Sequence, residues 1–123
     1  MGKKILIIED EKPLLSALKD KFSRENLETL DAKNGKEGLE IALKKHPDLI
    51  LLDLVLPIID GLEMLKKLRK DTWGKNAIVM ILTNLSDAEK LAEAIKIGVD
   101  DFMVKTDWTL EKIVKKVKKR LGK

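Results

Sequence analysis

The sequence predicts an α/β protein in which a doubly wound, five-stranded parallel sheet is covered by helices on both faces. Short runs that are apolar throughout, such as Ile5–Ile8 and Leu49–Leu52, are typical of strands buried on both faces of a parallel sheet. These runs alternate along the chain with segments whose apolar residues recur at helical spacing. With 123 residues, of which 44% are hydrophobic and 37% charged, the chain fits one domain over residues 1–123.

The first half of the chain contains two strand–helix units. The run Ile5–Ile8 is the first strand, and Pro13 lies where the first turn of a helix tolerates proline. Leu27–Ala32 is more polar, as an edge strand would be. Asn34-Gly35 marks a turn before the second helix, which ends at Pro47 because the residue before a proline avoids helical geometry. The apolar positions of these two helices are Leu14, Leu15, Leu18 and Phe22, then Leu39, Ala42 and Leu43.

The second half contains the third strand, Leu49–Leu52, and two further strand–helix units. We predict a helix over about Asp60–Lys70, a strand over Ala77–Leu82 and a fifth strand over about Asp101–Lys105. Asp87 can cap the helix between those two strands, and Gly98 can end it. The apolar positions of the last three helices are Leu62, Leu65 and Leu68; Ala88, Leu91, Ala92 and Ile95; and Leu110, Ile113, Val114, Val117 and Leu121.

Composition excludes several classes of function. The chain has no cysteine, which removes disulfides, thiolate zinc sites, iron–sulfur clusters and cysteine nucleophiles. His46 is the single histidine, so a zinc site of ordinary composition is disfavoured. No apolar run approaches the roughly 18 residues that span a bilayer, and the N-terminus does not resemble a signal peptide. We therefore expect a cytoplasmic protein without a membrane partner.

The net charge of +4 arises mainly at the C-terminal end of the chain. Cations in the last turns of a helix are stabilised by its dipole, so a solvated helix face explains this cluster. The aromatic content of 3% offers no stacking platform, and we expect no direct nucleic-acid binding. The clustered cations are Lys112, Lys115, Lys116, Lys118, Lys119, Arg120 and Lys123.

Polar side chains follow several of the predicted strands, at one edge of the sheet. The carboxyl ends of the central strands are where sites lie in such sheets. Converging carboxylates repel unless a cation neutralises them, and clustered hard oxygens suit magnesium or calcium. A glycine-rich phosphate cradle would need backbone N–H groups where this chain has an acidic run, which disfavours a nucleotide site. The residues at this edge are Glu9, Asp10 and Glu11 after the first strand, Asp53 after the third, Thr83 after the fourth and Lys105 ending the fifth.

These residues carry a family resemblance that spans the chain from about Lys3 to Leu121. The sequence resembles the receiver domain of two-component response regulators, of the single-domain chemotaxis type. The resemblance implies a flavodoxin-like fold with strand order 2-1-3-4-5. The matching motifs are Glu9-Asp10, Asp53, Pro57 with Asp60-Gly61, Thr83 and Lys105, in that order along the chain.

The resemblance implies a phosphorelay function. Asp53 would accept a phosphoryl group from a phosphohistidine of a sensor histidine kinase or phosphotransfer protein. Lys105 and Thr83 would contact the phosphoryl oxygens, and catalysis would consist of positioning and charge neutralisation. The cofactor would be Mg²⁺, which keeps several waters and takes few protein ligands. Those ligands would be Asp10, Asp53 and the backbone carbonyl of Val55, with Glu9 acting through a water.

The resemblance also implies a switch and a downstream partner. Thr83 would draw its loop inward, and Phe102 occupies the aromatic switch position of the family. The face made by the fourth helix, the fifth strand and the fifth helix would then bind an unknown protein target. The chain would be a signalling protein rather than an enzyme, and a monomer or a weak dimer.

Two other functional classes are alternatives to this interpretation. A metal-dependent phosphatase of similar topology would need a second aspartate two residues after its nucleophile, where this chain has Val55. A phosphorylation-independent interaction module of receiver shape would typically lack one of Asp10, Asp53 or Lys105, and all three are present. This module is the alternative that we retain.

Several residues also have purely structural interpretations. Glu9 and Asp10 can cap the first helix, and Phe102 can simply fill the core. Thr106 replaces the proline that usually follows the lysine of the family. Because a non-proline cis peptide costs roughly 2.5–4 kcal/mol, we expect the Lys105–Thr106 bond to be trans.

Overall fold

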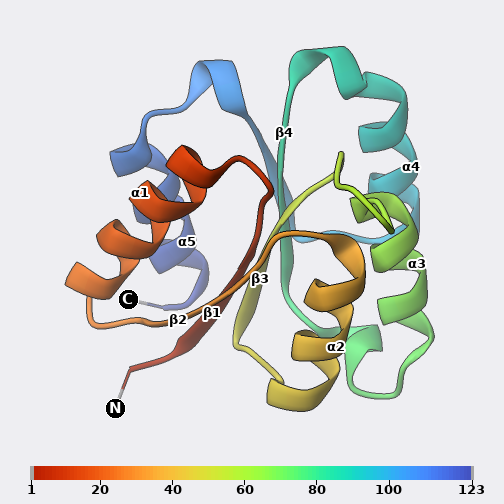
Figure 1. The fold of residues 1–123 in the computed structure, drawn as a ribbon, viewed down its shortest axis with the longest axis horizontal. Coiled ribbons are helices and arrows are strands. Elements are labelled where there is room, and N and C mark those ends of the chain that lie inside the picture. The colour runs from red at the N-terminus through yellow and green to blue at the C-terminus, as the bar shows by residue number, and fades with distance from the viewer. Residues whose placement is uncertain (1, 123) are drawn as a thin grey trace.

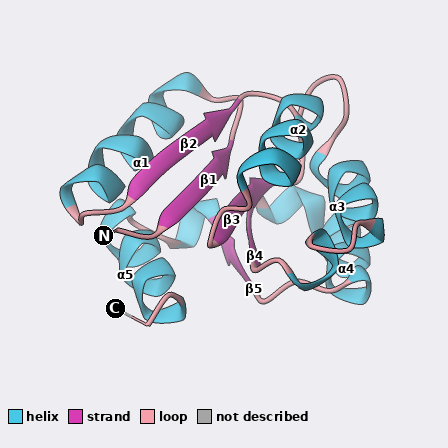
Figure 2. Ribbon diagram, turned by 90° about the horizontal axis from the view of Figure 1, so that it is seen from below, coloured by secondary structure: helices cyan, strands magenta, loops and turns pink. Residues whose placement is uncertain are grey.

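The structure, a computed structural model, describes residues 2–122, with the side chain of Leu85 outside the description. Five strands form one parallel sheet in the order β2-β1-β3-β4-β5 (Figures 1 and 2). This architecture confirms the predicted fold class and strand order. The strands are β1 (Lys4–Ile8), β2 (Glu28–Ala32), β3 (Leu49–Asp53), β4 (Val79–Thr83) and β5 (Asp101–Val104).

Five helices cover the sheet in two layers. Figure 1 shows α1 and α5 together on one side of the sheet, and α2, α3 and α4 on the other. No helix in the part of the chain that the structure describes is long and apolar enough to cross a membrane. The helices are α1 (Lys12–Arg24), α2 (Gly35–Lys45), α3 (Gly61–Lys70), α4 (Ala88–Ile97) and α5 (Leu110–Arg120).

The sheet divides the core into two apolar layers. Alternate residues of a strand point to opposite faces, so Ile5 and Ile7 pack in the layer under α1 and α5, and Leu6 and Ile8 in the layer under α2 to α4. These four residues and the whole of β3 are buried. The unbroken apolar runs of the sequence reflect this burial on both faces. β2 is one of the two edge strands and is buried fully only at Ala32, which confirms its interpretation.

Each strand lies within two residues of its predicted bounds, and the largest difference is at the start of β4. β4 begins at Val79 rather than Ala77, and the carbonyl of Ala77 accepts a hydrogen bond of 2.8 Å from the Arg69 guanidinium. β5 ends at Val104, and Lys105 begins a short 3-10 turn, Lys105–Asp107. The prediction that Lys105 ends a strand was therefore wrong by one residue.

Most helix ends follow the capping signals. Asn34 and Asp60 each accept a hydrogen bond from the backbone N–H three residues on, and so begin α2 and α3. His46 ends α2 in the left-handed conformation (φ 47°), and Gly98 ends α4 with φ 119°. Asp87 occupies the position before α4, but its side chain makes no capping hydrogen bond.

The aromatic residues differ in how deeply they are packed. Trp73 and Trp108 pack against the two core layers. Trp73 also stacks on His46, with ring centroids 4.3 Å apart. Phe102, by contrast, is 39% exposed on β5 and does not fill the core.

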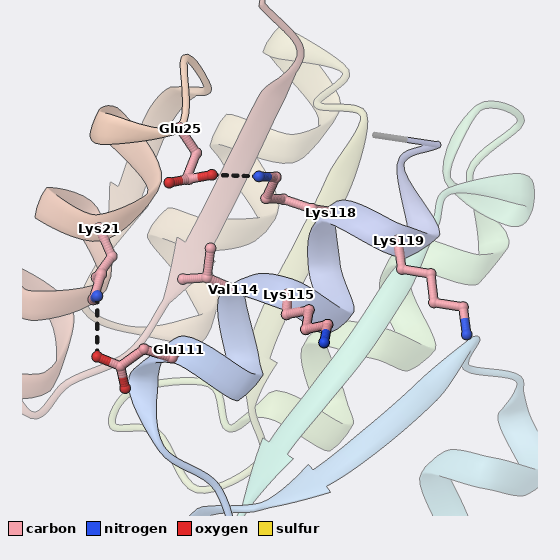
Figure 3. Close-up of a pocket in the computed structure, with 7 residues that line it drawn as sticks. All are labelled: Lys21, Glu25, Glu111, Val114, Lys115, Lys118 and Lys119. Carbon is pink, nitrogen blue, oxygen red and sulfur yellow. Dashed lines mark hydrogen bonds and ion pairs between the residues drawn. The ribbon is translucent and has the colours of Figure 1, made fainter.

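A hollow of about 450 Å³ lies between α1 and α5. Figure 3 shows two ion pairs spanning it, Lys21 with Glu111 and Lys118 with Glu25, beside Val114. Its other lysines come from the cationic face of α5 that the sequence indicates. None of its lining residues belongs to the acidic edge of the sheet, so the size of a hollow does not identify the functional site.

Candidate functional site

The acidic residues that follow β1 and end β3 meet at one edge of the sheet. Because β1 and β3 are parallel neighbours, their carboxyl ends lie side by side. Carboxylate oxygens of Glu9, Asp10 and Asp53 lie within 4.8 Å of one another. Glu9 and Asp53 are buried, whereas Asp10 is exposed. The structure therefore brings together three of the predicted metal-binding side chains.

The Lys105 ammonium lies inside this acidic group. Its Nζ atom is 3.0 Å from Asp53 Oδ2, 3.0 Å from Glu9 Oε1 and 2.8 Å from Glu11 Oε2. Lys105 thus reaches the site although it belongs to a turn and is followed by Thr106. No peptide bond among residues 2–122 is cis, so the Lys105–Thr106 bond is trans, as expected.

Glu11 is the contact that sequence reasoning missed. It stands third in the acidic run after β1, but no role was assigned to it, because no motif of the resemblance includes it. Its hydrogen bond with Lys105 joins residues that are 94 positions apart. Glu9 and Asp10 do not cap α1, whose N-cap is Glu11 without a side-chain capping bond.

Burial and like charge shape the protonation of this group. Burial, then repulsion by Asp53, raises the pKa of Glu9 from 4.5 to about 7. Burial likewise raises the pKa of Asp53, against the hydrogen bond and charge of Lys105. Burial lowers the pKa of Lys105, but its hydrogen bonds to Glu11 and Asp53 outweigh this and raise it overall. The single positive charge of Lys105 does not neutralise the negative charges of the surrounding carboxylates.

One oxygen of Glu9 identifies where a cation fits. Glu9 Oε2 accepts a hydrogen bond of 3.0 Å from the Glu11 backbone N–H. Glu9 Oε1 is buried and has no hydrogen-bond partner, and its 3.0 Å contact with Lys105 is an ion pair only. A buried charged oxygen without a hydrogen bond is costly. A hard divalent cation beside these carboxylates suits this donor set.

The raised pKa of Glu9 predicts that the metal-free protein loses stability as pH rises. The folded state holds the proton up to about pH 7, whereas the unfolded chain releases it near 4.5. The stabilisation is therefore complete below pH 4.5 and is lost by about pH 7, at a cost of about 1–3 kcal/mol. Thermal melts in EDTA from pH 5 to pH 8 should show a falling melting temperature, and Glu9→Gln should flatten the fall. An equal slope in Glu9→Gln and in the exposed control Glu40→Gln would contradict this expectation.

The loop after Asp53 is fixed by two backbone contacts. The Val55 N–H donates to Asp53 Oδ1 over 3.1 Å, and the Gly61 N–H donates to the Leu54 carbonyl over 2.8 Å. Gly61 is packed so closely that an added Cβ would lie 2.2 Å from the Asp53 carbonyl oxygen. The Asp60-Gly61 motif thus holds the start of α3 against the backbone of Asp53.

Gly61→Ala is expected to displace the backbone of Asp53, since the atoms in the way belong to the main chain. Forcing such a contact costs of the order of 1–3 kcal/mol. We expect a lower denaturant midpoint than in the wild type, together with shifted amide resonances from Asp53 to Val55. Gly122→Ala, with no atom within 4 Å of the added Cβ, is the control for the contact, although its φ of 81° adds strain of its own. Unchanged amide resonances in Gly61→Ala would contradict the proposed packing.

Thr83 is near the acidic group in the sheet but does not bond to it. It ends β4, is buried, and its hydroxyl makes a long contact of 3.4 Å with the carbonyl of Asn84. β4 is the neighbour of β3, and Thr83 lies one position beyond the partner of Asp53. The hydroxyl is therefore close to the edge but is not engaged with the charged residues there.

Most of the chain matches one family of known proteins. Residues 5–118 match the family model described as response regulator receiver domain. The chain is 35% identical over 98 residues to sporulation initiation phosphotransferase F of Bacillus subtilis, covering 80% of this chain and 77% of that protein. It is 33% identical over 122 residues to the probable transcriptional regulator ycf27 of Porphyridium aerugineum, covering 98% of this chain and 50% of the relative.

The solved structures add agreement in the fold. The receiver domain of sensor histidine kinase PA1611 from Pseudomonas aeruginosa matches with a TM-score of 0.84 and 19% identity, each chain being covered fully. That structure has a magnesium ion coordinated in its active site cleft. Several curated relatives are longer: the chain spans half or less of the length of three transcriptional regulators that it matches.

Proposed function

The chain belongs to the response regulator receiver domain family of two-component systems, and from this premise we propose that it accepts a phosphoryl group on Asp53. An oxygen of the Asp53 carboxylate attacks the phosphorus of a phosphohistidine on a sensor histidine kinase or phosphotransfer protein. The new O–P bond forms as the N–P bond breaks, and the electron pair returns to the histidine ring nitrogen. The observation that carries this proposal is the buried Asp53 carboxylate held 3.0 Å from the Lys105 ammonium within an acidic group.

The proposed cofactor is Mg²⁺. Asp10, Asp53 and the backbone carbonyl of Val55 would hold it, and Glu9 would act through a water. When bound, the ion supplies charge neutralisation for the phosphoryl oxygens. The clustered carboxylates and the unpartnered oxygen of Glu9 support this assignment.

Lys105 and Thr83 are proposed to contact the transferred group. The Lys105 ammonium can turn from the carboxylates to the phosphoryl oxygens as a mobile point charge. Thr83 has a hydroxyl without a strong partner, which leaves it available as a donor. Both residues position and neutralise the group rather than exchange protons with it.

Two exposed apolar side chains beside the site support a protein as the phosphodonor. Val55 is 43% exposed and Ile58 is 76% exposed, both in the loop after Asp53. Ile58 also has φ 69°, a left-handed conformation that strains a β-branched residue. No contact within the described chain offsets this strain and apolar exposure. Such features are typical of a surface that contacts another protein.

The experiment that tests this function is phosphorylation by acetyl phosphate, followed on a phosphate-affinity gel. The protein should shift in the presence of Mg²⁺ and should not shift in EDTA. Asp10→Ala should lose both the shift and Mg²⁺ binding measured by calorimetry. No shift of the wild type would favour the phosphorylation-independent interaction module, and steady release of phosphate with turnover would favour a phosphatase.

The proposed output is a change in the face formed by α4, β5 and α5. Thr83 would move towards the phosphoryl group, and the exposed Phe102 ring would turn inward as the loop after β4 moves. Only Ala94 of α4 is fully buried, which supports this helix as the element that shifts.

Beryllofluoride, a mimic of the phosphoryl group, is expected to change amide hydrogen exchange in residues 85–94 and 102–109. The reason is that Thr83 and Lys105 lie at the strand ends from which these segments leave. Exchange in α2 should stay the same and serves as the internal control. A response confined to the loop after Asp53 would contradict the proposed coupling.

A further inference from the structure

The Lys105 ammonium already has three carboxylate neighbours. An ammonium carries three N–H groups, and three carboxylate oxygens surround this one at 2.8–3.0 Å. The contacts with Asp53 and Glu11 are hydrogen bonds. A phosphoryl oxygen that binds Lys105 therefore competes with these carboxylates for the ammonium.

The three partners differ in their access to solvent. The side chains of Glu9 and Asp53 are 2% and 5% exposed, whereas that of Glu11 is 58% exposed. A phosphodonor must come from solvent, and Glu11 is the one exposed carboxylate among these three partners. The Glu11 carboxylate is therefore the partner that Lys105 can exchange at the lowest cost, because water can solvate the released charge.

We propose that Glu11 is a positioning residue that holds Lys105 before phosphoryl transfer and competes with the phosphoryl group for its ammonium. The proposal rests on the proposed function of Asp53. In the free protein Glu11 keeps the ammonium at the mouth of the site, beside Asp53. When a phosphoryl group binds, the Lys105–Glu11 hydrogen bond is exchanged for one to a phosphoryl oxygen.

The Glu11 carboxylate makes no other hydrogen bond or ion pair among the described residues. Its backbone N–H donates to Glu9 Oε2, and its carbonyl accepts from the Leu15 N–H in the first turn of α1. Neither contact uses the carboxylate, and the side chain does not cap α1. Substitutions of this side chain should therefore leave the fold and the position of Glu9 intact.

Removing the Glu11 charge should strengthen binding of a phosphoryl mimic. Glu11→Gln frees Lys105 and removes a negative charge that faces the anionic group. Because Glu11 is exposed and its ion pair is of the weak surface kind, the expected gain in beryllofluoride affinity is about two- to fivefold. Glu11→Asp keeps the charge and should stay close to the wild type.

The test measures beryllofluoride affinity in saturating Mg²⁺ by ¹⁹F NMR, for the wild type, Glu11→Gln, Glu11→Asp and the control Asp107→Asn. Asp107 is exposed in the turn that begins with Lys105, and it is not a partner of the ammonium. The ¹⁵N resonance of Lys105 Nζ reports the exchange directly: it should shift in free Glu11→Gln and move less on addition of the mimic than in the wild type.

The expected result is tighter binding in Glu11→Gln only, with the changed Lys105 resonance. Equal or weaker binding in Glu11→Gln, or the same gain in Asp107→Asn, would overturn the role of Glu11 while the wild type still binds the mimic. A wild type that binds no beryllofluoride would overturn both this inference and the proposed function.

Discussion

Asp53→Asn is expected to abolish covalent phosphorylation by acetyl phosphate in Mg²⁺. The amide has no anionic oxygen with which to attack phosphorus, and Asp53 is the buried carboxylate at the centre of the site. The variant should fold normally, because asparagine preserves the side-chain shape and can still accept the Val55 N–H bond. Burial raises the pKa of Asp53, so removing its charge should not destabilise the fold.

The control for this substitution is Asp107→Asn, an exposed aspartate in the turn that contains Lys105. It should phosphorylate at the wild-type rate. Intact-protein mass spectrometry gives the fraction phosphorylated, and a thermal melt confirms that both variants are folded. Phosphorylation of Asp53→Asn to the wild-type extent would show that the phosphoacceptor lies elsewhere.

Lys105→Met is expected to slow phosphorylation by about a hundredfold to a thousandfold, the usual effect of removing one group that stabilises charge in a transition state. Methionine keeps most of the volume of the side chain, which is 12% exposed, and removes its ammonium. Without that charge the pKa of Glu9 and that of Asp53 should rise further, because both carboxylates lose a cation. The initial rate at saturating Mg²⁺ is the measurement.

Lys112→Met is the matched control, because Lys112 is an exposed lysine of α5. Its phosphorylation rate should equal that of the wild type. A Lys105→Met variant within threefold of the wild type would show that the ammonium only pairs with carboxylates in the resting protein. In that case the contacts at 2.8–3.0 Å would be structural and not part of the transfer.

The fold could be predicted from the sequence because its strands are buried on both faces. Such strands must be apolar throughout, so Ile5–Ile8 and Leu49–Leu52 stand out from the amphipathic helices between them. The strand bounds could be predicted only to within two residues, because a strand ends where its backbone hydrogen bonds leave the sheet, which the side-chain pattern does not show. The carbonyl of Ala77, for example, accepts a hydrogen bond from the Arg69 guanidinium, and no apolar pattern around Ala77 reveals that contact.

The positions of the site residues could also be predicted, but their contacts could not. Parallel strands bring their carboxyl ends to one edge, which places Glu9 and Asp53 together once the strand order is known. The reach of the Lys105 side chain to Glu11 depends on the path of a turn and on rotamers, which the sequence pattern does not encode. The exposure of Phe102 was open for the same reason, since an aromatic residue in a strand fits the core equally well.

The most direct test of the central claim is to locate the phosphoryl group by reduction with borohydride. An acyl phosphate of aspartate is reduced to homoserine, whereas an unmodified carboxylate is not. After treatment with acetyl phosphate and Mg²⁺, peptide mass spectrometry should find homoserine at position 53 and unmodified aspartate at position 10. Homoserine at another position, or none in a protein that has gained phosphate, would contradict the assignment of Asp53 as the phosphoacceptor.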